Sequence, residues 1–114
     1  MEKVVLIGDK ELKLKSSLLT IVSYKNIFGT DLFNDIQKMD ITNKKQIANM
    51  THVIQTLFQI IYVLHKPYTK LTFEEFLSQF DFDIISDVHT LESISTVIGE
   101  LLASNKGPGQ PNNP

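Results

Sequence analysis

The chain has 114 residues, enough for one domain with a single hydrophobic core and too few for two. It contains no cysteine, which excludes disulfides, thiol catalysis and cysteine-ligated zinc. All eleven basic residues are lysines and the formal net charge is −2. This balance argues against a nucleic-acid partner, because arginine is the usual bidentate contact to phosphate and guanine.

Charge is unevenly distributed along the chain. Residues 1–50 carry eight lysines and six acids, whereas residues 51–114 carry three lysines and seven acids. The resulting charges of +2 and −4 would favour head-to-tail association into a homo-oligomer. Ordinary solvated faces are the simpler interpretation of such a difference.

We expect neither a leader nor a membrane span. The apolar run that follows Glu2 and Lys3 is too short for a signal peptide. No stretch approaches the roughly 18 consecutive apolar residues of a membrane helix. The sequence therefore predicts a cytoplasmic protein with no membrane partner.

Residues 3–15 predict a β-hairpin. Val4–Ile7 is apolar and β-branched, Gly8–Lys10 has turn chemistry, and leucines alternate with lysines in the segment ELKLK. The alternation places the leucines on one face and the lysines in water. Because an isolated hairpin is marginally stable, it must lie on the helices or pair with another strand. Its outer edges are places where a second copy would add.

Two helices joined by a tight turn are predicted over 17–28 and 31–39. Gly29 suits the left-handed end of the first helix. Thr30 is the expected N-cap of the second, with Asp31 at its positive end. The apolar residues of the first helix recur at helical spacing, and its buried face is expected to consist of Leu18, Ile21, Val22 and Phe28.

The longest predicted helix spans about 43–65, begins at a cap from Thr42 or Asn43, and ends before Pro67. Its main apolar stripe consists of Ile47, Met50, Ile54, Leu57, Ile61 and Leu64. Five more apolar residues widen the surface beyond this stripe: Val53, Phe58, Ile60, Tyr62 and Val63. Such a helix is either central in a bundle or covered by a partner, and we favour the central position.

Two further helices are predicted over about 72–80 and 90–103. Thr72 and Glu75 fit a capping box at the start of the first. Thr90 with Ser93 gives the second helix a weaker cap.

Gly99 interrupts the last predicted helix, which suggests that another helix packs closely against it. Residues 105–114 contain no apolar residue to bury and are rich in proline, so they predict a disordered C-terminal tail. The expected fold is mainly α, a small helical bundle with an N-terminal β-hairpin, forming a single domain over 1–104.

We find no recognisable catalytic, cofactor-binding or metal-binding motif. The three histidines are too far apart in sequence for a helical metal clamp: His52, His65 and His89. The neighbouring carboxylates Glu74–Glu75 and Asp81–Asp83 are more simply solvated groups than an acid–base pair. The sequence therefore predicts a protein that is not an enzyme and needs no cofactor or metal.

A partner-binding surface is the remaining candidate for function. Most of the aromatic residues lie on helical stripes and are expected in the core. Four of them are also candidates for an apolar patch that faces a partner: Phe58, Tyr62, Phe80 and Phe82.

The order and spacing of four phrases cover residues 4–106: VVLIGDKELKLK, YKNIFGTDLFNDI, TFEEFLSQF and VIGELLASNK. In this respect the chain resembles the tail assembly chaperones of long-tailed phages and prophages of low-GC Gram-positive bacteria. The resemblance implies a small, mostly helical, non-enzymatic protein. Such chaperones bind and solubilise the tape-measure protein, help to recruit tail-tube subunits, act in the host cytoplasm and are absent from the mature virion. Many also exist in a longer, frameshifted form.

Two other classes of protein remain open. Short helices with tight joints also occur in small phage or prophage regulators with a helix-turn-helix, although the lack of arginine argues against DNA binding. An enzyme subunit whose site is completed by another chain is the third alternative.

Overall fold

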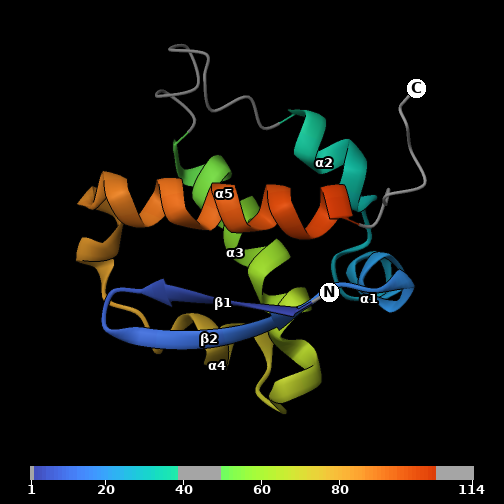
Figure 1. Ribbon diagram of the computed structural model, residues 1–114, viewed down its shortest axis with the longest axis horizontal. Helices are drawn as coiled ribbons and strands as arrows, with labels where there is room; N and C mark the ends of the chain where they lie inside the picture. Colours follow the sequence, from blue (N-terminus) through green and yellow to red (C-terminus); the bar gives the residue numbers. More distant parts are fainter. Residues whose placement is uncertain (1, 39–49, 105–114) are drawn as a thin grey trace.

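The computed structural model describes residues 2–38 and 50–104. The fold is mainly α with an antiparallel N-terminal hairpin, as predicted (Figure 1). In chain order the elements are β1 (Glu2–Ile7), β2 (Lys10–Lys15), α1 (Leu18–Phe28), α2 (Leu32–Lys38), α3 (Met50–His65), η2 (Lys66–Tyr68), α4 (Phe73–Leu77), η3 (Phe82–Ser86) and α5 (Val88–Ser104).

These bounds follow the predicted elements with local differences. The helix predicted over 72–80 ends earlier, at Leu77, and a separate turn of 3₁₀ helix follows it. The last helix begins at Val88 rather than at residue 90. Several predictions lie outside the described residues, namely the caps at Thr42 and Asn43, the stripe residue Ile47, and the tail over 105–114.

The hairpin closes through a two-residue turn, and its register pairs Ile7 with Lys10. Gly8, the first turn residue, has a φ of 65°, a left-handed geometry that glycine adopts without a Cβ clash. The strands alternate as predicted. One face is buried and consists of Val5, Ile7, Leu12 and Leu14.

Both long edges of the hairpin have neighbours. Helix α5 runs alongside β1 (Figure 1), and Lys3 Nζ lies 3.1 Å from Glu100 Oε1 across this contact. On the β2 side, His65 Nδ1 lies 2.8 Å from the Lys13 carbonyl oxygen. Because a carbonyl oxygen only accepts, Nδ1 carries the proton in this bond. The edge of β2 is therefore occupied at this residue by the protein's own side chain.

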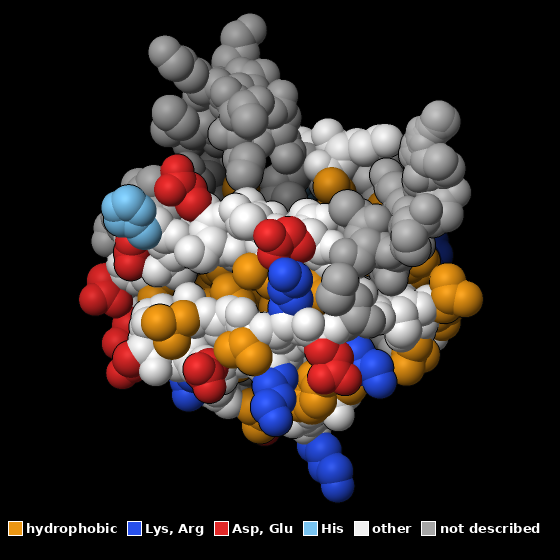
Figure 2. Space-filling model, viewed as in Figure 1, with side chains coloured by type: hydrophobic (Ala, Val, Ile, Leu, Met, Phe, Trp, Pro, Cys, Tyr) orange, Lys and Arg blue, Asp and Glu red, His pale blue; other side chains and the backbone are white. Residues whose placement is uncertain are grey.

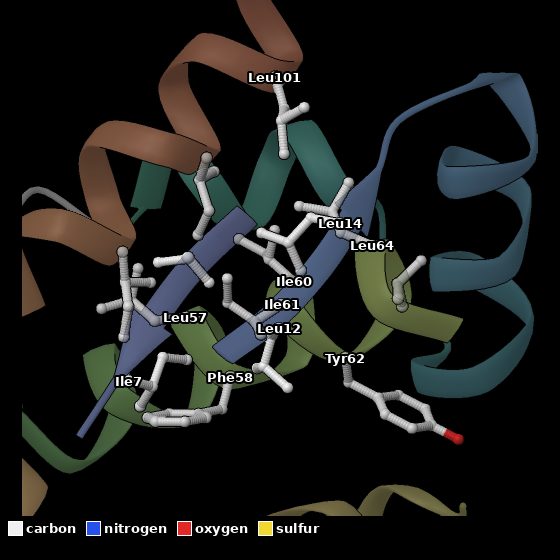
Figure 3. Packing of buried hydrophobic residues seen from close by; sticks show 14 of the residues in the cluster. Ile7, Leu12, Leu14, Leu57, Phe58, Ile60, Ile61, Tyr62, Leu64 and Leu101 are labelled. Atoms are coloured by element: carbon white, nitrogen blue, oxygen red, sulfur yellow. The ribbon is translucent and has the colours of Figure 1, made fainter. Parts of the chain in front are cut away.

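Helix α3 is the centre of the molecule, which confirms the central position favoured from the sequence. Helices α1, α2, α4 and α5 and strand β2 all pack on it. Every side chain from Ile60 to Leu64 is buried. In Figure 3, Ile7 lies against Phe58, and Leu14 lies beside Leu64, so the hairpin's buried face packs directly on this helix. Over residues 53–64, the apolar surface of α3 is thus covered by the chain itself, whereas Ile47 and the side chain of Met50 lie outside the described part.

The predicted buried face of α1 is wrong. Leu18 is 81% exposed and Val22 is 53% exposed, whereas the fully buried positions are Thr20 and Tyr24. Of the four expected residues, only Ile21 and Phe28 pack against the core. The helix is rotated because it seats Tyr24 between the other helices.

Tyr24 joins three helices through its hydroxyl. Its Oη lies 2.7 Å from Asp35 Oδ2 on α2 and 3.1 Å from Gln59 Oε1 on α3. Thr30 Oγ1 donates a second hydrogen bond of 2.6 Å to the same Asp35 oxygen. Burial, together with the carboxylate of Asp35, raises the pKa of Tyr24 far above its ordinary value. The hydroxyl therefore remains a neutral donor at all ordinary pH.

The joint between α1 and α2 is partly as predicted. Gly29 ends α1 with a φ of 78°, in the left-handed region. Asp31, and not Thr30, caps α2, because its Oδ2 accepts a hydrogen bond of 2.9 Å from Asn34 N. Thr30 is instead engaged with Asp35. The two neighbouring residues compete for the cap, and the carboxylate is favoured at the positive helix end.

The capping box of α4 is confirmed. Thr72 N donates to Glu75 Oε1 at 2.8 Å, and Glu75 N donates to Thr72 Oγ1 at 3.1 Å. The expected cap of the last helix, Thr90 with Ser93, is wrong. Asp87 caps α5 instead, as the acceptor for the backbone N–H groups of two residues and for one hydroxyl.

The cap at Asp87 predicts an acid-sensitive contribution to stability. Hydrogen bonds from Thr90, through its side chain first and its backbone next, hold the pKa of this carboxyl below its ordinary value. The unfolded chain therefore binds the proton more readily than the folded one. The contribution is fully present above the ordinary pKa of 3.8 and is lost as pH falls through the folded value.

We expect Asp87→Asn to flatten the loss of stability below pH 4, measured by urea unfolding at a series of pH values. Ser17→Ala, which removes the uncharged N-cap of α1, serves as the control and should lower the stability by a similar amount at every pH. An identical slope in wild type and Asp87→Asn would contradict this assignment.

Gly99 does not mark a close helix contact, contrary to the sequence-based expectation. It is exposed, and a Cβ built on it meets no atom within 4 Å. We therefore expect Gly99→Ala to raise the free energy of unfolding by about 1 kcal/mol, the difference in helix propensity. Gly29→Ala should act in the opposite direction, since alanine is strained at a φ of 78°. Urea unfolding of both variants measures the two changes in the free energy of unfolding.

Candidate interaction surface

Two of the four aromatic candidates lie in the core. Phe58 is 5% exposed and Tyr62 is 3% exposed. The Tyr62 hydroxyl donates a hydrogen bond of 2.6 Å to the Leu71 carbonyl oxygen. The ring of Tyr62 contacts those of Phe73 and Phe76. Tyr62 therefore holds α4 against α3, and both candidates are buried in the core of the domain.

The other two candidates are closer to the surface. Phe80 is half-buried, and its ring centroid lies 5.5 Å from that of Phe58 and 5.2 Å from that of Phe76. Phe82, at the start of η3, is 86% exposed. The structure therefore does not gather the four residues into one patch. Of the four candidates, partner binding stays a prediction for Phe80 and Phe82.

Acidic side chains surround Phe82. Its neighbours Asp81 and Asp83 are exposed and line a shallow hollow of about 240 Å³ beside the hairpin turn. In Figure 2 most of the acidic side chains in view lie along the left edge. Within residues 2–38 and 50–104, no group of three or more metal-ligating side chains forms a site.

The histidines are separate from one another in role. His65 binds the hairpin edge, and its ring stacks near those of Tyr68 and Phe76. The side chain of His89 is 96% exposed and faces Glu92 at 3.9 Å. His52 is exposed on α3.

The carboxylate of Glu75 is used in the α4 capping box.

Among the residues that the structure describes, the largest uncovered apolar feature lies on α1, and it was missed from the sequence. Leu18 and Leu19 are 81% and 62% exposed, and Val22 beside them is 53% exposed. Figure 2 shows hydrophobic side chains gathered at the right-hand edge, where Figure 1 places α1. We call Leu18, Leu19 and Val22 the α1 surface. The available signal was that α1 has apolar residues on all sides, more than one buried face uses.

A smaller apolar area lies on the outward face of the hairpin. Val4 is 52% exposed and Leu6 is 57% exposed, on the side of β1 that faces away from α3. Their cross-strand partners are Lys13 and Glu11. These charges interrupt the area, so it is less continuous than the α1 surface.

Helix α2 lacks the features of a DNA recognition helix. Such a helix enters the major groove with several side chains that contact bases and phosphates. Helix α2 has seven residues, and its charged side chains are Asp35 and Lys38. Asp35 is moreover bound to Tyr24 and Thr30. In the described part of the chain, no helix is long and apolar enough to cross a bilayer.

The chain was also compared with known proteins. No family model matches it, and no curated protein or solved structure shows significant similarity.

Proposed function

We propose that this protein is a tail assembly chaperone that binds the tape-measure protein, keeps it soluble during tail assembly, and helps to recruit tail-tube subunits. It acts without catalysis, as a binding module in the host cytoplasm, and leaves before the virion is complete. The observation that carries the proposal is the α1 surface, an uncovered apolar helix face on a folded domain. A tape-measure protein presents long apolar helical stripes, which are the complementary chemistry.

The site of binding differs from the one suggested by the sequence. Over residues 53–64, the apolar surface of α3 is covered by the chain's own elements, so this part of the helix is not the surface that we propose for a partner. The α1 surface takes its place. Several copies along one tape-measure chain would hold it through effective concentration, even where each contact is weak.

Co-expression with the tape-measure protein tests this function. We expect the tape-measure protein to move from the insoluble to the soluble fraction and to co-purify with the chaperone. The control is co-expression with an unrelated, insoluble helical protein as long as the tape-measure protein. This control protein should stay insoluble, which excludes a general solubilising effect. A tape-measure protein that stays insoluble at every expression ratio would contradict the proposal.

A further inference from the structure

Helix α1 is apolar on two opposite sides. Tyr24 and Phe28 lie on the side that packs on the core. Leu18 and Val22 are one helical turn apart on the roughly opposite side, with Leu19 next to them. A helix that already buries one face and still exposes three large apolar residues has surface suited to a second contact.

A hollow adjoins the α1 surface. It has a volume of about 160 Å³ and lies between the start of α1 and the end of α3. Its apolar lining includes Leu19, Val63 and Pro67. A hollow of this size accommodates one large apolar side chain, so the surface combines a flat stripe with a single anchoring position.

The segments that build this surface carry lysines and no acidic side chains of their own. Glu2 of β1 lies beside Tyr68 of η2. Residues 12–30 and 63–73, which build α1 and the wall of the hollow, contain five lysines and no Asp or Glu. Lys66 lines the hollow, and Lys25 lies in the last turn of α1. A partner with carboxylates beside its apolar stripe would be attracted here, and one with lysines would be repelled.

A second copy of this chain does not offer that combination. On the acidic half, the large exposed apolar residues of the described elements are Tyr68, Leu77 and Phe82, each on a separate short element. The exposed positions of α5 include Glu92, Thr96 and Glu100, which are polar. No described helix of the chain therefore presents an apolar stripe flanked by acids.

We propose that the α1 surface is a docking site for an amphipathic helix of another protein, with a leucine-type stripe flanked by Asp or Glu. One large apolar side chain of that helix enters the hollow beside Leu19, and its carboxylates lie near Lys25 and Lys66. The inference rests on the proposed function and adds the surface and the charge of the segment that it selects.

Two synthetic helical peptides test the proposal on the full chain. Each has about 20 residues and leucines at three- and four-residue spacing, with either Glu or Lys on both flanks. We expect the Glu-flanked peptide to bind at least about tenfold more tightly by calorimetry. Raising the salt from about 0.05 M to about 0.5 M should weaken that binding. Equal affinity of the two peptides, or no binding of either, would overturn the proposal.

Surface variants locate the binding. Leu19→Ala should weaken binding of the Glu-flanked peptide about tenfold. Val22→Glu should weaken binding more than Val22→Lys, because both substitutions remove the same apolar side chain and only the glutamate repels the peptide's carboxylates. Leu6→Ala is the matched control, since it removes a similarly exposed leucine from the outward face of the hairpin. Circular dichroism checks that each variant stays folded. An equal loss in Leu6→Ala, or self-association of the wild type that Leu19→Ala abolishes, would count against this site.

The peptide assay and the co-expression assay together distinguish a failure of the docking site from a failure of the chaperone function. If Leu19→Ala and Val22→Glu still solubilise the tape-measure protein, the docking site is wrong and the chaperone function stands. If the peptide binds as expected while the wild type leaves the tape-measure protein insoluble, the docking site stands and the chaperone function is wrong.

Discussion

Replacing Ile61 with alanine is expected to lower the free energy of unfolding by about 2–5 kcal/mol. Ile61 is completely buried at the centre of α3, where the hairpin and the other helices meet. Removing three carbons there costs their transfer from water and leaves a cavity that the surrounding elements fill only in part. For a domain of this size the total stability is of the order of 5–15 kcal/mol, so the variant loses a large share.

Leu18→Ala is the matched control for this substitution. It removes a similar side chain that is 81% exposed, and its effect should stay within about 0.5 kcal/mol. Urea unfolding followed by circular dichroism measures both variants. Equal losses would mean that α3 is not the centre of the core and that α1 is packed with its other face inward.

Tyr24→Phe is expected to cost about 1.5–3 kcal/mol, the range for a hydrogen bond to a charged group. The substitution keeps the ring and removes only the hydroxyl that joins Asp35 and Gln59. The carboxylate of Asp35 then loses a donor in a partly buried setting, and the packing of α2 on α1 and α3 loosens. Tyr68→Phe removes a hydroxyl that hydrogen-bonds Glu2 at the surface, and its cost should be smaller than that of Tyr24→Phe, because an exposed contact to a charged group contributes little.

A double variant with Asp35→Asn separates the hydrogen bond from the packing. If the bond accounts for the loss, the effects of Tyr24→Phe and Asp35→Asn should be smaller together than their sum. Strict additivity would show that the two groups do not interact in solution. Thermal unfolding of the four proteins completes the cycle.

Features decided by neighbouring residues were predictable from the sequence. The hairpin follows from alternation and from one glycine in its turn, and the α4 capping box follows from Thr72 and Glu75 alone. Caps with adjacent competitors were not predictable in the same way. Thr30 and Asp31 both suit the start of α2. Asp31 is the cap, and the hydroxyl of Thr30 is bound to Asp35, a contact that cannot be read from the two residues themselves.

The orientation of α1 could not be read from its own residues. Its apolar side chains allow more than one buried face, and the choice depends on acceptors that lie 11 and 35 residues further along the chain. The burial of the aromatic candidates could not be predicted from the sequence for the same reason. Phe58 and Phe82 have the same side chain, and only the covering of α3 by distant elements places one inside and the other in water.

The packing of β1 against α5 has a consequence for synthesis on the ribosome. The first strand lies alongside the last helix, and Ser16 Oγ donates a hydrogen bond of 3.2 Å to the Leu101 carbonyl oxygen. Because a hairpin alone is marginally stable, the nascent chain exposes an incompletely folded, hydrophobic N-terminal segment until α5 has left the exit tunnel. Truncation within α5 should therefore yield a chain captured by general chaperones or degraded, rather than a smaller folded product.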